Sequence, residues 1–327
     1  MYHIISICVN RSVYSILQNL VVSTIHVHMI LLQGQCSYEL RHKCGPYEIR
    51  SILPDGNGEN EMIVQPRMAS TVMLLRDSVR VDGTSEIEVF MVRRVVQSEF
   101  MPDVYVFPGG SVSADDCIAE RIEGIYELVT PAMADPEGRT ALGNGVRAAA
   151  IRELFEEANV LLAHREGTVL AIDEESVTRF ANYRQAFNER KGSLIEMARA
   201  EHLVLATNSL AYFAHWITPE GMPKRFDTHF FLAIAPAEQE ALYDKLETSA
   251  GVWINPQDAI AQFEQEKFPI AFPTFQQLRD LSAFHTAQEA IQATETRYVP
   301  THTPTLTTQE GAIHISLPEA PDTFWKQ

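Results

Sequence analysis

The sequence has few basic residues for its length. Its 327 residues include 26 lysines and arginines against 43 aspartates and glutamates, which gives a formal net charge of −17 at pH 7. Binding to a nucleic-acid backbone needs clustered positive charge that displaces counterions. The balance therefore argues against a nucleic-acid partner. An acidic excess favours solubility instead, and it implies that a site for a phosphorylated substrate would need cations.

Cysteine is also scarce, and it follows no recognisable pattern. The four cysteines show neither a C-x-x-C spacing nor the density of a disulfide scaffold. The sequence therefore indicates neither a zinc site nor a disulfide framework, and an intracellular, cytoplasmic setting is the expectation. The chain ends in Trp325, Lys326 and Gln327 instead of Ser-Lys-Leu, so a peroxisomal address is not expected. The cysteines are Cys8, Cys36, Cys44 and Cys117.

A convincing membrane span is missing as well. Residues 16–32 are mostly apolar, but the polar Gln18, His26 and His28 interrupt the run and make it a poor transmembrane helix. A signal peptide would need a compact basic start and a cleavage site of small residues, and neither is convincing here. We therefore expect no membrane partner. Residues 1–65 are interpreted as an N-terminal extension and linker outside the folded domain.

Glutamate is concentrated at one point of the chain, in residues 151–160. A helix turns by about 100° per residue, so Glu153, Glu156 and Glu157 fall on one face of a helix through this segment. Like charges so spaced repel one another, and a helix that keeps them together usually has a cation to neutralise them. Oxygen ligands without Cys or His suit Mg²⁺ or Mn²⁺. For this pattern alone, a solvated acidic face is the alternative. The opposite face would be apolar, with Ile151, Leu154, Phe155 and Ala158.

These glutamates and an upstream glycine turn at residues 107–110 resemble the signature of the Nudix hydrolases. That signature reads G-x5-E-x7-R-E-U-x-E-E-x-G-U, where U is apolar. Gly110 takes the first glycine, Asp116 the first acid and Arg152 the arginine. The three glutamates and Val160 take the later positions. The resemblance favours a metal site over a solvated face.

The sequence departs from this signature at two points. Asn159 replaces the last glycine, which is tolerable because Asn accepts the left-handed conformation that can end a helix. In addition, 35 residues separate Asp116 from Arg152 where the signature has seven, so about 28 residues are inserted inside the motif. Such an insertion is typical of the branch similar to the peroxisomal coenzyme A diphosphatase. Further stretches similar to that branch are residues 100–102, 216–219 and 225–232, within a similarity that runs from about residue 66 to about 284.

The resemblance implies an α/β fold, the Nudix α/β/α sandwich with a mixed central sheet, enlarged by helical insertions. The Nudix domain would cover residues 66–293, with insertions at about 117–144 and 173–206 and a loosely ordered tail over 294–327. Periodicity and turn residues place the individual elements. The predicted strands are residues 69–75, 87–93, 104–107, 210–217, 225–235 and one at 253, and the predicted helices are 117–129, 146–163, 173–206 with a break at Gly192, 256–263 and 273–284.

The resemblance also implies roles for the residues of the site. The three glutamates would be catalytic and would hold Mg²⁺ or Mn²⁺, and Arg152 would orient them. Gly109 and Gly110 would approach the metal and the substrate with their backbone, because a side chain there would obstruct the approach. Arg225 is expected either to hold a substrate phosphate by bidentate hydrogen bonds or to form a surface ion pair with Asp227. Both interpretations stay open.

A further carboxylate precedes the last predicted strand. Glu247 lies six residues before Trp253. Many Nudix enzymes draw a metal ligand or general base from the loop ahead of this strand, so Glu247 is a catalytic candidate. The histidines of the preceding strand pair, His215 and His229, are interpreted as structural residues and not as ligands.

The implied activity is hydrolysis of a nucleoside diphosphate linked to another moiety, with a small-molecule nucleotide as substrate. The branch implies coenzyme A or acyl-coenzyme A, cut to adenosine 3′,5′-bisphosphate and a phosphopantetheine. We do not find the Leu-Leu-Thr-x-Arg motif of another coenzyme A diphosphatase branch before the glycine turn, so NADH, ADP-ribose and other dinucleotides stay open. A Nudix fold that binds or regulates without turnover is the alternative of another class, although such proteins typically lose one of the glutamates.

Overall fold

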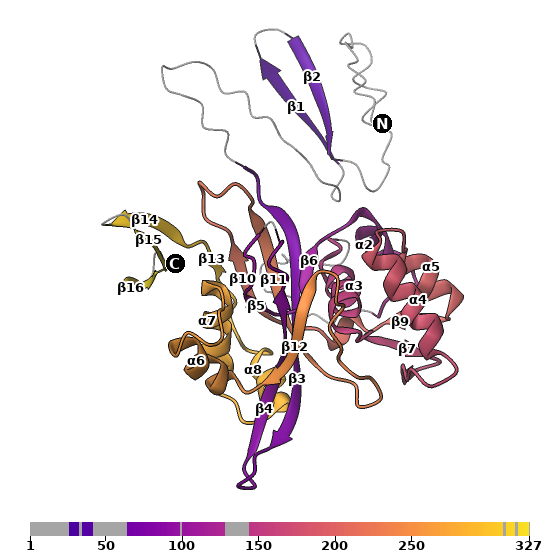
Figure 1. The fold of residues 1–327 in the computed structure, drawn as a ribbon. Helices are drawn as coiled ribbons and strands as arrows, with labels where there is room; N and C mark the ends of the chain where they lie inside the picture. Colours follow the sequence, from indigo (N-terminus) through magenta and orange to yellow (C-terminus); the bar gives the residue numbers. More distant parts are fainter. Residues whose placement is uncertain are drawn as a thin grey trace. The chain divides into compact units, whose positions relative to one another are not determined.

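The structure is a computed structural model (Figure 1) that describes residues 26–32, 35–41, 64–98, 100–127, 144–309, 312–317 and 320–326. The chain separates into two compact units, residues 1–45 and 46–327. The first unit contains a hairpin in which β1 (His26–Leu32) pairs antiparallel with β2 (Gln35–Arg41). Among the described residues, no helix is long and apolar enough to cross a membrane.

A mixed sheet of eight strands forms the centre of the second unit. Its order is β12-β4-β3-β11-β10-β13, with β5 paired to β4 and β6 paired to β3. β3 and β11 run parallel, whereas β4 pairs antiparallel with both β3 and β12. The predicted mixed sheet is therefore confirmed. Its strands are β3 (Arg67–Val79), β4 (Ser85–Arg94), β5 (Tyr105–Val106), β6 (Gly109–Ser111), β10 (Ala211–Ile217), β11 (Phe226–Ile234), β12 (Thr248–Ile254) and β13 (Thr301–His302).

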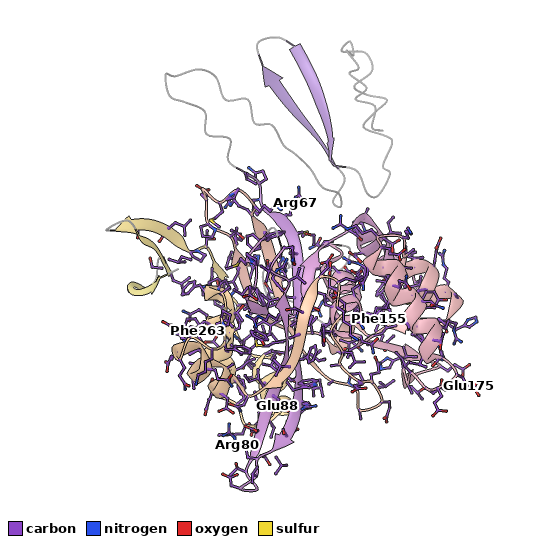
Figure 2. All side chains as sticks on the ribbon, viewed as in Figure 1. Arg67, Arg80, Glu88, Phe155, Glu175 and Phe263 are labelled. Atoms are coloured by element: carbon purple, nitrogen blue, oxygen red, sulfur yellow. The ribbon has the colours of Figure 1, made fainter. Side chains whose placement is uncertain are left out.

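Helices cover both faces of this sheet, as the predicted α/β/α sandwich requires (Figure 1). Successive residues of a strand point to opposite faces, so Val72 of β3 packs in the core under α3 and its neighbour Met73 in the core on the other side. Figure 2 shows Phe155 and Phe263 on these two sides. The first face carries α2 (Ala114–Ala119), α3 (Val146–Ala158), α4 (Val177–Asn188) and α5 (Leu194–Ala200), and the second carries α6 (Pro256–Glu264), α7 (Phe272–Leu281) and α8 (Ala287–Ala293).

Helix α2 leads into the insertion inside the motif. It covers residues 114–119, so the predicted helix at 117–129 has the wrong bounds. The helix begins earlier because Ser113 and Asp116 form a capping box, in which each side chain accepts a hydrogen bond from the other residue's N–H. It ends at Ala119, and a turn with Gly124 at a φ of +83° follows.

Most of the same insertion is not described. Residues 128–143, within the insertion expected at about 117–144, lie outside the described residues.

Helix α3 carries the glutamates and ends at Ala158, five residues before the predicted end at 163. Asn159 is the reason: its φ of 61° places it in the left-handed region, where its N–H still donates to the Phe155 carbonyl at 3.1 Å. The expectation that Asn takes over the conformation of the missing glycine is confirmed. Beyond it, the apolar residues of 160–163 are buried in the core without helical structure.

The second insertion packs on α3. Phe180 and Phe187 of α4 meet Phe155 of α3 edge to face, with ring centroids 6.3 and 6.1 Å apart. The predicted break near Gly192 separates α4 from α5, but the helical prediction up to residue 206 is wrong. The last residues of the predicted helix form the strand β9 (Leu203–Leu205) instead. This strand belongs to a small sheet with β7 (Ala163–Arg165) and β8 (Thr168–Val169), and the 3-10 turn η2 (Thr207–Ser209) follows it.

The C-terminal tail, predicted to be loosely ordered, contains strands. β13 joins the central sheet beside β10, and a separate antiparallel sheet follows it. Alternating β-branched residues such as those of TLTTQ favour strands over coil. The separate sheet consists of β14 (Thr305–Gln309), β15 (Ala312–Leu317) and β16 (Ala320–Lys326).

Candidate functional site

The glycine turn and the glutamates of α3 lie against each other, as the motif predicts. The Gly109 N–H donates to Glu157 Oε2 at 2.9 Å. A Cβ added at Gly110 would lie 2.4 Å from Glu153 Oε1, and one added at Gly109 would lie 2.4 Å from the Ser70 carbonyl oxygen. Gly109 therefore excludes any side chain, because the clash is with backbone, and a side chain at Gly110 would displace the Glu153 carboxylate. We call Glu153, Glu156 and Glu157, together with Arg152, the glutamate site.

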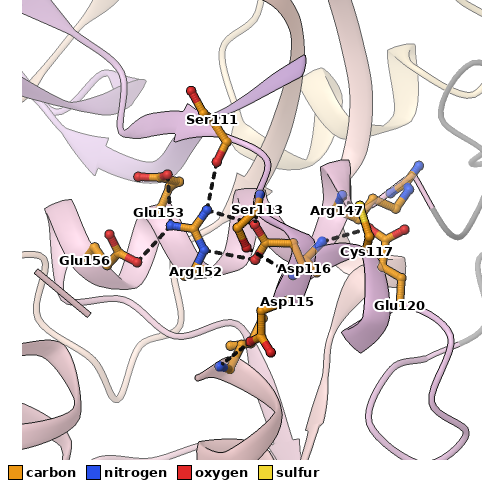
Figure 3. A network of polar contacts seen from close by, with 12 residues as sticks. Ser111, Ser113, Asp115, Asp116, Cys117, Glu120, Arg147, Arg152, Glu153 and Glu156 are labelled. Atoms are coloured by element: carbon orange, nitrogen blue, oxygen red, sulfur yellow. Dashed lines mark hydrogen bonds and ion pairs between the residues drawn. The ribbon is translucent and has the colours of Figure 1, made fainter. Parts of the chain in front are cut away.

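Arg152 organises this site (Figure 3). Its Nη1 donates to Glu153 Oε1 at 2.9 Å and to Glu156 Oε1 at 2.8 Å. Its Nε and Nη2 form a bidentate pair with the Asp116 carboxylate, both at 2.9 Å, and Nη2 also donates to the Ser111 carbonyl at 2.9 Å. Arg152 thus contacts carboxylates and not open solvent, which matches the orienting role implied by the resemblance. Asp116 reaches it despite the 35 residues between them.

Burial and crowding shift the protonation of these groups. Desolvation raises the pKa of Glu153 to about 7, although the nearby Arg152 charge opposes the shift. Desolvation also raises the pKa of Glu156, and that of Glu157 rises well above its ordinary value through burial and the charge of Glu153. Burial alone would lower the pKa of Arg152, but the neighbouring carboxylates outweigh it and raise that pKa. Burial therefore favours the protonated forms of these glutamates.

A carboxylate from the insertion caps the start of α3. Glu120 is buried, and its Oε1 accepts the Arg147 and Ala148 N–H groups at 2.7 and 2.9 Å. Its Oε2 accepts the Gly145 N–H at 3.1 Å. A negative group at a helix N-terminus satisfies the first N–H groups and the helix dipole. The sequence analysis missed this role, because Glu120 lies 25 residues from Gly145 and no local capping motif points to it.

Two carboxylates of the loop before β12 face the glutamates. The charge of Glu247 raises the pKa of Glu156 and that of Asp244 raises the pKa of Glu157, so both lie near the site. The Glu247 side chain is exposed. Asp244 Oδ1 accepts the N–H of Glu247 at 3.0 Å and thereby shapes the loop. The role of Glu247 stays a prediction, and Asp244 is a neighbour that the sequence analysis did not single out.

Two arginines complete the surroundings of the carboxylates. Arg94, at the end of β4, lowers the pKa of Glu157 and donates from Nη2 to the Ser98 hydroxyl at 2.8 Å. Arg184 of α4 donates to the Glu156 carbonyl at 2.9 Å and to the Leu242 carbonyl at 2.6 Å. Arg184 therefore fastens the last turn of α3 to the loop before β12. The second insertion supports the position of the glutamates in this way.

Arg225 lies at the start of β11 with its guanidinium against backbone carbonyls. Its Nε donates to Thr218 at 3.0 Å and its Nη1 to Val64 at 2.9 Å, and the residue is buried. These bonds join the β10–β11 turn to the chain just before β3. A contact of Arg225 with substrate stays a prediction.

The donors of the glutamate site fit Mg²⁺ or Mn²⁺. They are carboxylate oxygens beside backbone that carries no side chains, and burial, together with the neighbouring carboxylates, raises their pKa values. They are not yet gathered at one point, because Glu157 turns to Gly109 while the other two meet Arg152. A different group of three is gathered in the described part of the chain. The ligand atoms of His215, Asp227 and His229 all lie within 4.8 Å of one another.

Comparison with known proteins finds animal relatives of this chain. One is the "Acyl-coenzyme A diphosphatase NUDT19" of Xenopus laevis, 26% identical over 234 residues that cover 62% of each chain. The other is the protein of the same name in Gallus gallus, 27% identical over 288 residues that cover 73% of this chain and 75% of the relative. The chain thus spans less than two thirds of the length of the Xenopus protein.

The fold and the family follow from two further matches. The crystal structure of a NUDIX hydrolase from Alicyclobacillus acidocaldarius matches with a TM-score of 0.59 and 24% identity, covering 70% of this chain and 96% of that one. At this identity the match bears on the fold alone. The family model of the NUDT19 Nudix domain matches residues 66–281, close to the limits inferred from the sequence. The chain belongs to the Nudix hydrolase family, in its NUDT19 branch.

Proposed function

We propose that this protein is a metal-dependent diphosphatase that hydrolyses a nucleoside diphosphate linked to another moiety, with coenzyme A or acyl-coenzyme A as the substrate. One observation carries the proposal: Glu157 accepts a hydrogen bond from Gly109 of the glycine turn, and Glu153 and Glu156 are held by Arg152, which pairs with Asp116. The substrate class is supported by the names of the relatives in Xenopus and Gallus. A mere acidic surface would not need the side-chain-free backbone at Gly110.

The carboxylates of Glu153, Glu156 and Glu157 would hold Mg²⁺ or Mn²⁺. When bound, such an ion would act as a Lewis acid, lowering the pKa of the attacking water and neutralising charge on the leaving phosphate. The protein's own part is to align these carboxylates. Arg152 does so by holding one oxygen of Glu153 and one of Glu156, which leaves the second oxygen of each for the ion.

A proton must leave the attacking water, and Glu247 is the candidate to take it. Its side chain is exposed beside Glu156 and makes no hydrogen bond to a described residue. Arg152, by contrast, engages Glu153 and Glu156. A general base has to be within reach of the water and not already paired. A glutamate of the trio remains the alternative base, and comparison of Glu247→Gln with wild type distinguishes them.

Two alternatives compete with this proposal. NADH, ADP-ribose or another dinucleotide would use the same metal chemistry on a different substrate. A binding or regulatory module would bind nucleotides without turnover, but this chain keeps all three glutamates that turnover needs.

Product analysis by mass spectrometry separates these cases. The purified protein is incubated with Mg²⁺ or Mn²⁺ and a panel of coenzyme A, acyl-coenzyme A, NADH and ADP-ribose, with parallel reactions in EDTA. We expect adenosine 3′,5′-bisphosphate from the coenzyme A compounds, and none in EDTA. Cleavage of NADH or ADP-ribose instead would discard the coenzyme A substrate, and no cleavage of any compound would favour the binding module.

A further inference from the structure

Two histidines and an aspartate meet on neighbouring strands of the central sheet, outside the glutamate site. His215 of β10 and His229 of β11 are cross-strand partners, and their rings stack with centroids 4.4 Å apart. His215 Nε2 is hydrogen-bonded to Asp227 Oδ1, and His229 Nε2 lies 3.7 Å from the same oxygen. Both Nε2 atoms therefore converge on one carboxylate. We call these three residues the histidine cluster.

The other nitrogen of each ring is held by a hydroxyl group. His215 Nδ1 lies 2.9 Å from Thr301 Oγ1, and His229 Nδ1 lies 3.3 Å from the Tyr212 hydroxyl. When each Nδ1 carries the proton and donates it to its hydroxyl, each Nε2 presents a lone pair towards Asp227. Hydrogen bonds of this kind are typical of metal-ligating histidines, because they fix both the tautomer and the ring orientation.

The cluster is rigid and reachable. The histidine side chains are 4% and 3% exposed, whereas that of Asp227 is 29% exposed, so the carboxylate provides the open side. A bulge interrupts the pairing of β10 with β11 between Tyr212 and Ala214, but the register is regular from Ala214 to Ile217 and fixes the backbone at His215, Asp227 and His229. A site with two imidazoles, one carboxylate and an open side has the donor set of a catalytic-type Zn²⁺ site.

We propose that His215, Asp227 and His229 bind a transition-metal ion of the Zn²⁺ class, separate from the Mg²⁺ or Mn²⁺ of the glutamate site. Imidazole nitrogen favours Zn²⁺, Co²⁺ and similar ions over Mg²⁺, which prefers oxygen. Binding of the ion displaces the proton shared by His215 and Asp227. This inference does not depend on the proposed diphosphatase activity.

The two sites lie on the same face of the sheet without overlapping. Gly110, Ser70, His229 and His215 are successive partners on β6, β3, β11 and β10. Strands lie about 4.8 Å apart, so the histidines are roughly 10–15 Å from the glycine turn. Between them, the Ser70 hydroxyl is buried without a hydrogen-bond partner among the described residues. A polar ligand near this row would satisfy it.

Co²⁺ spectroscopy tests the proposal, because Co²⁺ bound by nitrogen in a four- or five-coordinate site absorbs visible light far more strongly than Co²⁺ bound by oxygens alone. The test uses the full chain carrying Glu156→Gln and Glu157→Gln, which weakens the glutamate site. We expect one equivalent of Co²⁺ with strong visible absorption, displaced by Zn²⁺ and not by Mg²⁺. Adding Asp227→Asn or His215→Gln should abolish the absorption, and Thr301→Val should weaken Co²⁺ binding about 10–100-fold.

A matched control uses the other histidine that pairs with a carboxylate, His164, which is bonded to Glu127 away from the cluster. His164→Gln should leave the Co²⁺ spectrum unchanged. Circular dichroism in EDTA checks folding, and if His215→Gln fails to fold, Asp227→Asn decides. No visible absorption in the parent, or absorption that survives Asp227→Asn in folded protein, would overturn the proposal and leave a hydrogen-bonded network only.

Discussion

The glutamate site and the histidine cluster share one face of one sheet but are built differently. The first takes its carboxylates from a single helix, α3, and needs Arg152 and Asp116 to hold them apart and in place. The second takes its ligands from two strands whose register is set by main-chain hydrogen bonds. The glutamate site therefore depends on how α3 begins and ends, whereas the histidine cluster depends on the sheet. The donors differ too, since oxygens suit Mg²⁺ and imidazoles suit Zn²⁺.

The largest effect should come from removing a glutamate. Glu156→Gln or Glu157→Gln should lower kcat/KM at least about 100-fold, because several kcal/mol of transition-state stabilisation depend on the bound ion. Thermal unfolding should show an intact fold. Glu264→Gln, on an exposed position of α6 on the other face, should keep wild-type turnover. Metal-dependent activity retained in either glutamate variant would count against the assignment.

The second effect is a pH dependence of the metal-free protein. The pKa of Glu153 is about 7 when folded and near 4.5 when unfolded. Its protonated form is thus favoured by folding, so the stability it contributes is present below about pH 4.5 and is lost as the pH rises through about 7. The loss is on the order of 3 kcal/mol. Urea unfolding in EDTA at pH 5 and pH 8 measures it.

Glu153→Gln is the control for this pH dependence, since it mimics the protonated side chain at every pH. The variant should lose less stability than wild type between pH 5 and pH 8. The histidine cluster contains no glutamate, so its variants should keep the wild-type contribution of Glu153. Equal losses in wild type and Glu153→Gln would show that Glu153 is not the group responsible.

A smaller effect should follow from Glu120→Gln. An amide cannot accept all three N–H bonds that Glu120 accepts at the start of α3, so the unfolding free energy should fall by about 2 kcal/mol. Turnover should fall as well, because α3 carries the glutamates. Glu196→Gln, an exposed position of α5, is the matched control and should have little effect. An unchanged melting temperature for Glu120→Gln would show that Glu120 does not stabilise the start of α3.

The smallest effect concerns the other end of α3. Asn159→Ala should lower the unfolding free energy by about 1 kcal/mol, because Ala tolerates the left-handed φ of 61° poorly. Asn159→Gly, which restores the glycine of the signature, should cost less than Asn159→Ala. Chemical denaturation of both variants measures the difference. If Ala were as stable as Gly at this position, the left-handed conformation would not be what ends the helix.

The sequence was sufficient for the parts of the fold that local patterns encode. The family resemblance predicted that Gly109 and Gly110 would lie at the glutamate site, and the branch resemblance predicted both insertions. The i,i+4 spacing of Arg152 and Glu156 suits an ion pair, which is found at 2.8 Å. The alternation of apolar residues located most strands of the central sheet, but β6 and β13 were missed.

Contacts between residues far apart in the chain could not be predicted from the sequence. The cap from Glu120 and the clamp from Arg184 join residues far apart in the chain, so no spacing rule points to them. The histidine cluster depends on the register of β10 and β11, which sets His215 opposite His229. Read singly, each histidine is an ordinary core residue. The start of α2 was missed because a capping box at Ser113 outweighed the apolar periodicity of residues 117–129.

The central claim is that a divalent ion at the glutamate site drives hydrolysis. The most direct test is the initial rate, by mass spectrometry, with the panel compound that the wild-type protein cleaves. EDTA-treated wild type and Glu157→Gln are measured before and after Mn²⁺ is added. We predict that wild type is inactive until Mn²⁺ is restored and that the variant stays inactive throughout. Equal wild-type rates with and without Mn²⁺, or full recovery of the variant, would contradict the claim.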